Sequence, residues 1–541
     1  MASRTNSGSS PAPMPSRIFF WSLVSALAGF LFGFDTVVIS GAEQTIQSLW
    51  NLSPGLHGIV MGSALYGTVL GSVFGGWPTD RWGRRPTLLW IGILYFVSAV
   101  WSALAGDPWS FIVARFIGGL GVGISTVVAP LYISEISPPD RRGRLTGMFQ
   151  FNIVFGILIA FLSNWLLRNT GEHAWRWMMG SEALPALLYT LACFLIPESP
   201  RWLLSRGRDA EAATVLQAMM PHEDATAVTA AADRIRIAPR AQGQRGADLL
   251  SPSVRRPLML AFLIALFNQL SGINAVLYFA PRIFGLTGSE NALGQSIGIG
   301  ITNLVFTFAG LWLIDRLGRR TLLYIGSVGY ILSLGLCAAA FFHWAPQFRA
   351  ASAAVDLKNA AAALATANPA RVESLRLDFK IRWNALAAAA ADPRSGASAI
   401  SLPAPPDPVH QREAAAAAAS EVLTASSHAA GSGGTMVLLC IFAFIAAHAI
   451  GQGAVIWVFL SEIFPDSCRA AGQALGSATH WIFAALLTTV FPLMMAVLPP
   501  GAVFLIFTGM MILQLIWVRA MVPETKGIPL EDIARKLGTA G

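Results

Sequence analysis

Long runs of apolar residues alternate with short polar stretches along most of this chain. Twelve of the runs are long enough to cross about 30 Å of hydrocarbon as helices that rise 1.5 Å per residue. They lie at approximately 18–41, 56–77, 87–105, 109–133, 145–167, 175–196, 257–281, 293–314, 321–343, 435–460, 470–494 and 501–521. The pattern predicts an all-α membrane protein with twelve transmembrane helices.

The first six runs and the last six carry matching motifs. GGWPTDRWGRRPTLL follows the second run and GLWLIDRLGRRTLLYIG ends the eighth. APLYISEISPPDRRGRL follows the fourth and VFLSEIFPDSCRAAG ends the tenth, while PESPRWLL and PETKG follow the sixth and twelfth. Such duplication predicts two pseudo-symmetric six-helix bundles with a binding site between them near mid-membrane.

These motifs set the predicted domain boundaries. They are a cytoplasmic tail at 1–17, an N-terminal bundle at 18–196, a cytoplasmic helical linker at 197–256, a C-terminal bundle at 257–521 and a cytoplasmic tail at 522–541. An Ala-rich insertion at 345–434 interrupts the second bundle. We expect two or three short helices with flexible joints there, which form either a poorly ordered, function-neutral segment or a partner-binding cap.

Composition and charge narrow the class of protein. With 54 % hydrophobic and 12 % charged residues, the chain does not fit a soluble enzyme. Its net charge of +8 comes from arginines in alternate loops, whereas the loops at 42–55, 106–108 and 495–500 contain no Lys or Arg. The positive-inside rule therefore places both termini in the cytoplasm, and the basic balance does not indicate nucleic-acid binding. We expect no removable signal peptide.

One carboxylate, Asp35, lies inside the first apolar run. Intramembrane charges are costly, so they usually pair with one another or line water, and they mark functional sites. Counted from the ends of their runs, Arg115 and Glu182 lie at the same depth as Asp35, about six or seven residues from the outer surface. The three residues are therefore predicted to form a triad. The alternative is a static ion pair that only packs helices.

Taken together, the paired D-R-x-G-R-R strings, P-E-S-P-R, P-E-T-K-G and Q-L-S-G-I-N resemble the sugar porter family of the major facilitator superfamily. This family includes bacterial proton-coupled xylose and galactose symporters and animal glucose facilitators. In the symporters, the residue at the Asp35 position accepts the proton, and protonation breaks its pairing with the arginine. Facilitators have a neutral residue there, so Asp35 favours coupling.

The resemblance also suggests a sugar site of neutral hydrogen-bonding groups and aromatic faces. The candidate ligands are Gln150, Gln269, Asn274, Tyr278, Asn303, Trp457, His480 and Trp481. For each amide, an interhelical hydrogen bond is the alternative. The sequence departs from the family at Asn268, which replaces a Gln, at His480, which replaces an amide, and at Ala454, which replaces a helix-breaking proline.

Charged residues repeat at equal spacing in the two halves at the cytoplasmic ends of the runs. We interpret them as salt bridges between the halves that stabilise the outward-facing state and break as the inside opens. The set is Asp80, Arg84, Glu135 and Arg142, with Asp315, Arg319, Glu462 and Arg469.

The sequence thus predicts a proton-coupled hexose or pentose symporter that imports sugar by alternating access. The alternatives are a proton-independent uniporter and, from another class, a membrane sugar receptor. We find no phosphate loop, nucleophile elbow or metal cluster, and we predict that the protein is not an enzyme and needs no cofactor beyond the coupling proton. The expected partners are the sugar, protons and the lipid bilayer of a bacterial inner membrane, with the protein acting as a monomer and binding no nucleic acid.

Overall fold

The fold was analysed on a computed structural model of the chain. It describes residues 16–138, 141–221, 223–237, 251, 254–365, 372–402, 411–465, 468–528, 532–533, 535 and 537. Most of the predicted N-terminal tail, and parts of the linker, the insertion and the C-terminal tail, lie outside these ranges. Helices are the only regular elements in the part of the chain that is described.

The first half consists of helices that cross the bundle and of short pieces at their ends. These are α1 (Ser16–Val38), η1 (Ile39–Gly41), α2 (Glu43–Leu49), α3 (Pro54–Phe74), α4 (Gly76–Trp82), α5 (Arg84–Leu104), α6 (Pro108–Ile136), α7 (Arg142–Leu167), α8 (Ala174–Gly180) and α9 (Ala183–Cys193). The linker adds α10 (Pro200–Ser205), α11 (Asp209–Met219) and α12 (Ala225–Ile237).

The second half repeats this plan with an interruption. It contains α13 (Arg255–Leu270), α14 (Ile273–Tyr278), α15 (Ala280–Gly285), α16 (Ala292–Leu317), α17 (Arg319–His343), α21 (Gly433–Ile450), α22 (Gln452–Glu462), α23 (Arg469–Val497) and α24 (Pro500–Met521). The insertion between α17 and α21 forms α18 (Ala345–Ala365), α19 (Val372–Ala390) and α20 (Arg412–Ala430).

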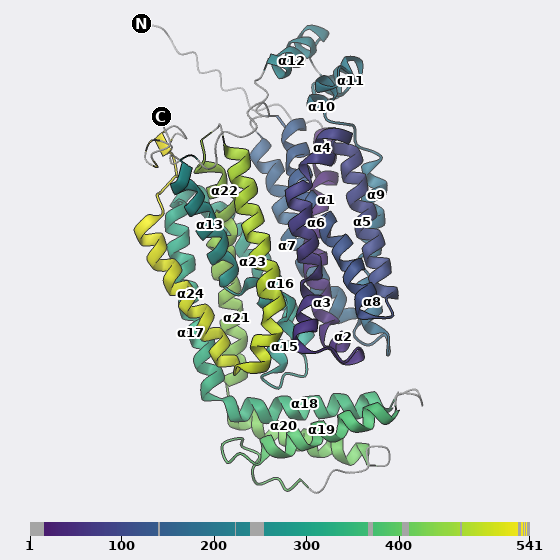
Figure 1. Cartoon of the computed structure of the whole chain (residues 1–541), viewed down its shortest axis with the longest axis vertical. Coiled ribbons are helices and arrows are strands. Elements are labelled where there is room, and N and C mark those ends of the chain that lie inside the picture. The colour runs from purple at the N-terminus through teal and green to yellow at the C-terminus, as the bar shows by residue number, and fades with distance from the viewer. Residues whose placement is uncertain are drawn as a thin grey trace.

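The two halves stand side by side, and α1 begins and α24 ends at the same end of the molecule (Figure 1). We call this the termini end; it also carries α10–α12. Helices α18–α20 lie at the opposite end, which we call the cap end. Close helix packing unites each half; in the first half, a Cβ on Gly119 of α6 would lie only 1.8 Å from the Ala64 carbonyl oxygen of α3. Glycine is therefore required where these two helices cross.

Eleven segments of the described chain are long and apolar enough to cross a membrane as continuous helices or helix pairs. The predicted sixth span is absent from this set because it is broken into α8 and α9, both of which pack against α5. Pro185 lies three residues into the predicted continuation and has no N–H to donate to the Ser181 carbonyl, which accounts for the break. With this kinked pair, the twelve spans of the major facilitator fold are complete.

Two other spans are broken near their middle. Gly272 separates α13 from α14 in the left-handed conformation with φ +87°, and a Cβ there would lie 2.7 Å from the Phe507 ring. Gly451 separates α21 from α22 with ψ −101°. A span that contains Ala454 in place of the family's proline is thus still interrupted, because a glycine can adopt the backbone angles of the break.

The insertion differs from the poorly ordered segment that we considered from its sequence. Its three helices have 21, 19 and 19 residues and pack around a core of their own, which includes Leu357, Phe379, Trp383 and Leu386. Alanines fill the helix contacts, where their small side chains allow close approach, and the large residues fill the centre. Buried aromatic side chains therefore give the insertion the defined packing that an alanine-rich composition alone does not predict.

Candidate functional site

Asp35 and Arg115 form a buried ion pair between α1 and α6. Arg115 Nη1 lies 2.5 Å from Asp35 Oδ1, and Nη2 lies 3.3 Å from Oδ2. Nη2 also donates to the Asp35 backbone oxygen at 2.9 Å. Both residues are 1 % exposed. Such a forked contact satisfies several polar atoms at once, which a charge pair requires in a low-dielectric interior.

The third predicted member of the triad, Glu182, joins this pair. It is buried in the break between α8 and α9, and its charged neighbours are Asp35 and Arg115. The break itself positions the carboxyl group, since Glu182 is the N-cap residue just before α9 and does not lie inside a continuous helix. Its Oε1 has no hydrogen-bond partner among the described residues.

Two hydroxyl groups of α5, which the sequence did not single out, complete this pocket. The Tyr95 hydroxyl lies in the electrostatic field of both Asp35 and Glu182. Ser98 lies one turn further on; a Cβ at Gly118 would lie 2.4 Å from its Oγ and 3.4 Å from Asp35 Oδ1. The only signal in the sequence was their spacing of three residues, which places both on one helix face.

The charges of this pocket do not balance when all three groups are ionised. Two carboxylates and one guanidinium sum to −1 in a site closed to solvent. A buried net charge is unfavourable, and one additional proton would neutralise the cluster. The arrangement can therefore hold one exchangeable proton on its acidic side chains.

A second polar group lies on α13 and α14, around the Gly272 break. Asn274 Nδ2 donates to Gln269 Oε1 at 2.7 Å, and Gln269 Nε2 donates to Asn268 Oδ1 at 3.0 Å. The same amide nitrogen lies 3.1 Å from a ring nitrogen of His480 on α23. These buried amides offer a cluster of donors and acceptors that can exchange its internal bonds for those of a polyhydroxylated ligand.

Aromatic rings lie next to these amides. The His480 ring is 5.1 Å from the Trp457 ring and 4.8 Å from the Trp481 ring, measured between centroids. Trp481 in turn contacts Phe32 of the first half at 5.6 Å. Trp457 is 40 % exposed. The predicted residues Gln269, Asn274, Trp457, His480 and Trp481 are thus brought together where the halves meet.

The other predicted ligands take different places. Asn303 is buried on α16, where its Oδ1 accepts a long 3.5 Å hydrogen bond from Thr307. Gln150 lies partly buried on α7, next to the Phe151 ring that contacts Phe308 of α16 at 5.5 Å. Tyr278 is buried on α14 and faces the first half, where Arg115 and Asp35 are its charged neighbours. Tyr278 therefore connects the two polar groups, because it lies four residues after Asn274 on one face of α14.

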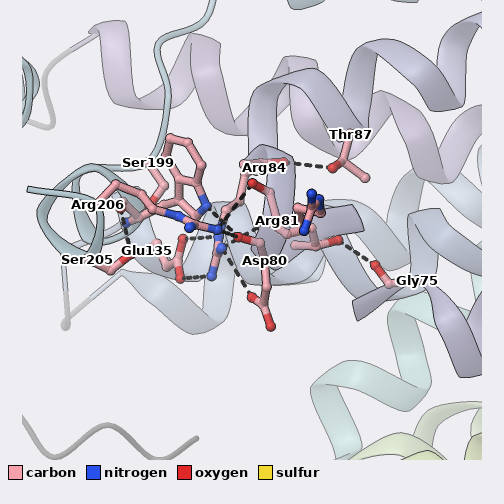
Figure 2. Close-up of polar contacts among 12 residues, drawn as sticks. Gly75, Asp80, Arg81, Arg84, Thr87, Glu135, Ser199, Ser205 and Arg206 are labelled. Atoms are coloured by element: carbon pink, nitrogen blue, oxygen red, sulfur yellow. Dashed lines mark hydrogen bonds and ion pairs between the residues drawn. The ribbon is translucent and has the colours of Figure 1, made fainter. Parts of the chain in front are cut away.

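The predicted charge sets lie at the termini end, and Figure 2 shows Asp80, Arg84 and Glu135 of the first set. Arg84 binds Glu135 through two 2.9 Å contacts and Asp80 at 3.4 Å. In the second half, Arg319 binds Glu462 at 2.8 Å and Asp315 at 3.3 Å. Each arginine begins a helix, α5 or α17, and reaches back one turn and across to a neighbouring helix.

These pairs lie within each half, whereas the sequence prediction placed them between the halves. The reason is local: Asp80 and Asp315 each precede their arginine by four residues, and Glu135 and Glu462 lie on helices packed against it. Arg142 is exposed at the start of α7, and Arg469 Nε donates to the Phe464 oxygen at 3.2 Å. Contacts between the halves in an outward-facing state stay a prediction.

The linker is attached to the same region of the first half. Trp202 Nε1 donates to the Asp80 backbone oxygen at 2.9 Å, and Arg206 Nη2 donates to it at 2.7 Å (Figure 2). Helix α10 is thus bonded to α4, the short helix that precedes Arg84. Among the described residues, His, Cys, Asp and Glu side chains form no group of three or more that could hold a metal ion.

A two-half helical bundle with a buried charge cluster and an amide–aromatic site where the halves meet defines a membrane transporter. The family model described as "Sugar (and other) transporter" matches residues 21–357 and 414–537. The chain therefore belongs to the sugar porter family of the major facilitator superfamily, whose members are transporters and not enzymes. The unmatched stretch, 358–413, falls inside the insertion.

Characterised relatives and solved structures match nearly the whole chain. The D-xylose-proton symporter of Escherichia coli is 29 % identical over 558 aligned residues, which cover 96 % of this chain and 95 % of the relative. The D-xylose transporter of Levilactobacillus brevis is 31 % identical, with 95 % and 94 % covered. The partially occluded inward-open structure of the E. coli xylose transporter XylE has a TM-score of 0.68 at 29 % identity and covers 95 % of this chain and 100 % of that one.

Proposed function

We propose that this protein is a proton-coupled symporter for a hexose or pentose. The observation that carries the proposal is the buried Asp35–Arg115–Glu182 cluster, because its formal charge of −1 becomes zero on binding one proton. Relatives named as xylose-proton and arabinose-proton symporters support the same assignment.

In this proposal the sugar binds the amides of α13 and α14 and packs its C–H face on Trp457. Protonation of Asp35 weakens its hold on Arg115, which frees α1 and α6 to move. Tyr278 conveys the change, since α14 carries Asn274 at the sugar site and Tyr278 against the charge cluster. The halves then rock about the bound sugar, so that the site opens to the other side.

The proposed setting is a bacterial inner membrane with the termini end in the cytoplasm and the cap end outside. This orientation agrees with the arginines at the termini end and with the absence of Lys and Arg from the short loops opposite. The protein acts as a monomer, since each chain holds both halves of its own site, and it requires no cofactor beyond the proton.

Uptake of sugar by proteoliposomes tests the coupling. Wild-type protein should accumulate sugar when the inside is made alkaline, and a protonophore should abolish the accumulation. The Asp35→Asn variant should lose accumulation while it retains sugar exchange. Undiminished uphill uptake by this variant contradicts the role of Asp35, and wild-type uptake that ignores the protonophore indicates a uniporter instead.

Asp107→Asn is the matched control for this experiment. Asp107 is an exposed residue of the same half that caps α6 by accepting hydrogen bonds from the N–H groups of Trp109 and Ser110, both at 3.0 Å. Asparagine caps helices about as well as aspartate. This substitution removes one carboxylate outside the buried cluster, and it should leave accumulation unchanged.

A further inference from the structure

The cap end contains a second buried charge cluster, which the transport site does not include. Glu43 is the first residue of α2, separated from η1 by Ala42 alone, and its side chain is fully buried. His57, on α3, is also fully buried. Arg282 lies on α15, which packs against η1, and only 26 % of its side chain is exposed.

The arginine binds the carboxylate with a two-pronged contact. Arg282 Nη2 donates to Glu43 Oε2 at 2.7 Å and Nε donates to Oε1 at 2.9 Å. Arg282 also donates to Gln47 Oε1, one turn further along α2. His57 Nε2 lies 3.0 Å from Glu43 Oε2 on the opposite side. The geometry is that of the strongest class of protein ion pairs, with both carboxylate oxygens occupied.

This contact joins the two halves of the molecule. Glu43, Gln47 and His57 belong to the first half, and Arg282 belongs to the second. The hydrogen bond between the hydroxyl groups of Tyr66 and Thr489, at 2.8 Å, also joins the halves and is neutral. Here α3 and α23 are in close contact, since a Cβ on Gly58 would lie 1.8 Å from the Thr489 backbone oxygen. The cap end is therefore closed, and separating the halves here would break a buried ion pair.

We propose that Glu43 and Arg282, supported by His57, form a charge lock that holds the cap end of the transport path closed. The inference rests on the proposed alternating-access function and adds the residues that set its conformational balance. The ion pairs at the termini end, Arg84–Glu135 and Arg319–Glu462, lie within single halves and impose no such barrier on opening that end.

The lock explains which conformation the chain adopts. A bonded cap end is the arrangement expected of an inward-facing conformation. The structural similarity agrees: the TM-score is 0.68 for both inward-open XylE structures and 0.64 for XylE bound to 6-bromo-6-deoxy-D-glucose. Loss of the lock should thus favour opening of the cap end.

Distances between spin labels test the lock in full-length protein reconstituted in nanodiscs. Ser48→Cys on α2 and Ser289→Cys after α15 place one label on each half at the cap end, and all four native cysteines are buried. Glu43→Gln and Arg282→Gln should each shift the distance distribution towards longer separations, with the open-to-closed ratio rising by roughly tenfold or more. Arg282→Lys, which keeps the charge without the fork, should give an intermediate shift.

The double variant Glu43→Gln/Arg282→Gln distinguishes a lock from two unrelated structural roles. If the residues act as a pair, the double variant should shift the distances no further than the larger single shift. Glu290→Gln is the matched control, because Glu290 pairs at the same end with Lys358 of the second half's own insertion. It should leave the distances unchanged.

Unshifted distances in folded Glu43→Gln, Arg282→Gln and Arg282→Lys proteins would overturn the lock. So would additive shifts in the double variant. Uptake by wild-type proteoliposomes is measured separately. If the wild type transports sugar but the substitutions leave the label distances unchanged, only the lock is refuted. If the wild type transports no sugar but the substitutions still lengthen the label distances, only the proposed function is refuted.

Discussion

Glu198 and Glu524 make the same contact in the two halves. Glu198 accepts hydrogen bonds from the backbone N–H groups of Arg84 and Arg85 at 2.9 and 3.2 Å, and Glu524 accepts those of Arg319 and Arg320 at 2.9 and 3.0 Å. Each carboxylate thus caps the N-terminus of the helix that follows a D-R-x-G turn. The repeated P-E-S and P-E-T motifs are therefore helix caps supplied from a distant part of the chain.

Removing either cap should lower stability without abolishing the fold. Glu198→Gln and Glu524→Gln each lose a charge that faces the positive end of a helix, and we expect a cost of about 1–2 kcal/mol for each. The two costs should add, since the sites lie in different halves. Thermal unfolding of the purified variants in detergent measures this. Glu421→Gln, an exposed change on α20, should unfold like wild type.

Sugar binding should depend strongly on the hydrogen-bonded amides. Gln269→Ala removes the side chain that contacts Asn268, Asn274 and His480 together, and it should raise the dissociation constant by roughly tenfold or more, which is about 1.4 kcal/mol. Calorimetric titration with the transported sugar gives the value. Gln217→Ala, on exposed α11, is the control. Unaltered affinity in Gln269→Ala would place the sugar elsewhere.

His480 should influence which sugar is preferred. His480→Gln restores an amide where the sequence departs from the family, so it changes both reach and hydrogen-bonding capacity at the Gln269 contact. We expect the order of preference in a competition panel of unlabelled hexoses, pentoses and polyols to change. An identical order for both proteins would show that His480 does not contact the sugar.

Tyr278→Phe should separate sugar binding from proton coupling. The substitution keeps the ring of Tyr278 packed on α14 but removes the hydroxyl that faces Arg115 and Asp35. We expect near-normal sugar affinity together with a lower accumulation ratio under a proton gradient. Equal accumulation by Tyr278→Phe and wild type would exclude a role of this hydroxyl in coupling.

Acidification should weaken the Glu43–Arg282 lock. Burial raises the pKa of Glu43, but the Arg282 charge and the hydrogen bonds from His57 and Arg282 outweigh it, so the net shift is downwards. A carboxyl with a lowered pKa stabilises the locked fold above its unfolded pKa of about 4.3, and this stabilisation disappears as pH falls through the folded pKa.

The difference in melting temperature between wild type and Glu43→Gln measures this dependence. It should be largest near neutral pH and should shrink below about pH 4. The charged neighbours of Glu43 are Arg282 and His57, and Asp356 of the insertion also interacts electrostatically with Arg282. Because Asp356 belongs to the insertion, Asp356→Asn should leave the pH dependence in place. A difference in melting temperature that stays constant across the pH range would contradict the prediction that Glu43 is ionised in the folded protein.

The membrane-embedded part of the site was largely predictable. A carboxylate and an arginine at equal depth in apolar spans have few alternatives to pairing, so Asp35–Arg115 followed from counting residues. Tyr95 and Ser98 did not, because hydroxyl groups are common in such spans and cost little there. In the charge sets at the termini end, Arg84 and Arg319 have carboxylate partners within their own halves, because the partners depend on helix packing that spacing alone does not reveal.

The cap end was the part that sequence could not predict. Glu43, His57 and Arg282 lie at the ends of spans, where charged residues are normally exposed, and their burial depends on two halves that meet over more than 200 residues of sequence. The packing of the insertion was not predictable from its composition either. An alanine-rich composition predicts helices, whereas their packing depends on a few large residues such as Phe379 and Trp383.

The insertion enters and leaves the second half at nearly one point. Trp344 precedes α18 and Gly433 begins α21, and a Cβ on Gly433 would lie 2.7 Å from the Trp344 ring. A segment whose two joints touch can be exchanged for a short turn, or for another folded protein, without separating the spans on either side. The insertion is thus a suitable place to attach another protein domain. It extends the molecule beyond the spanning helices with a folded feature, which antibodies could bind and which particle alignment in electron microscopy could use.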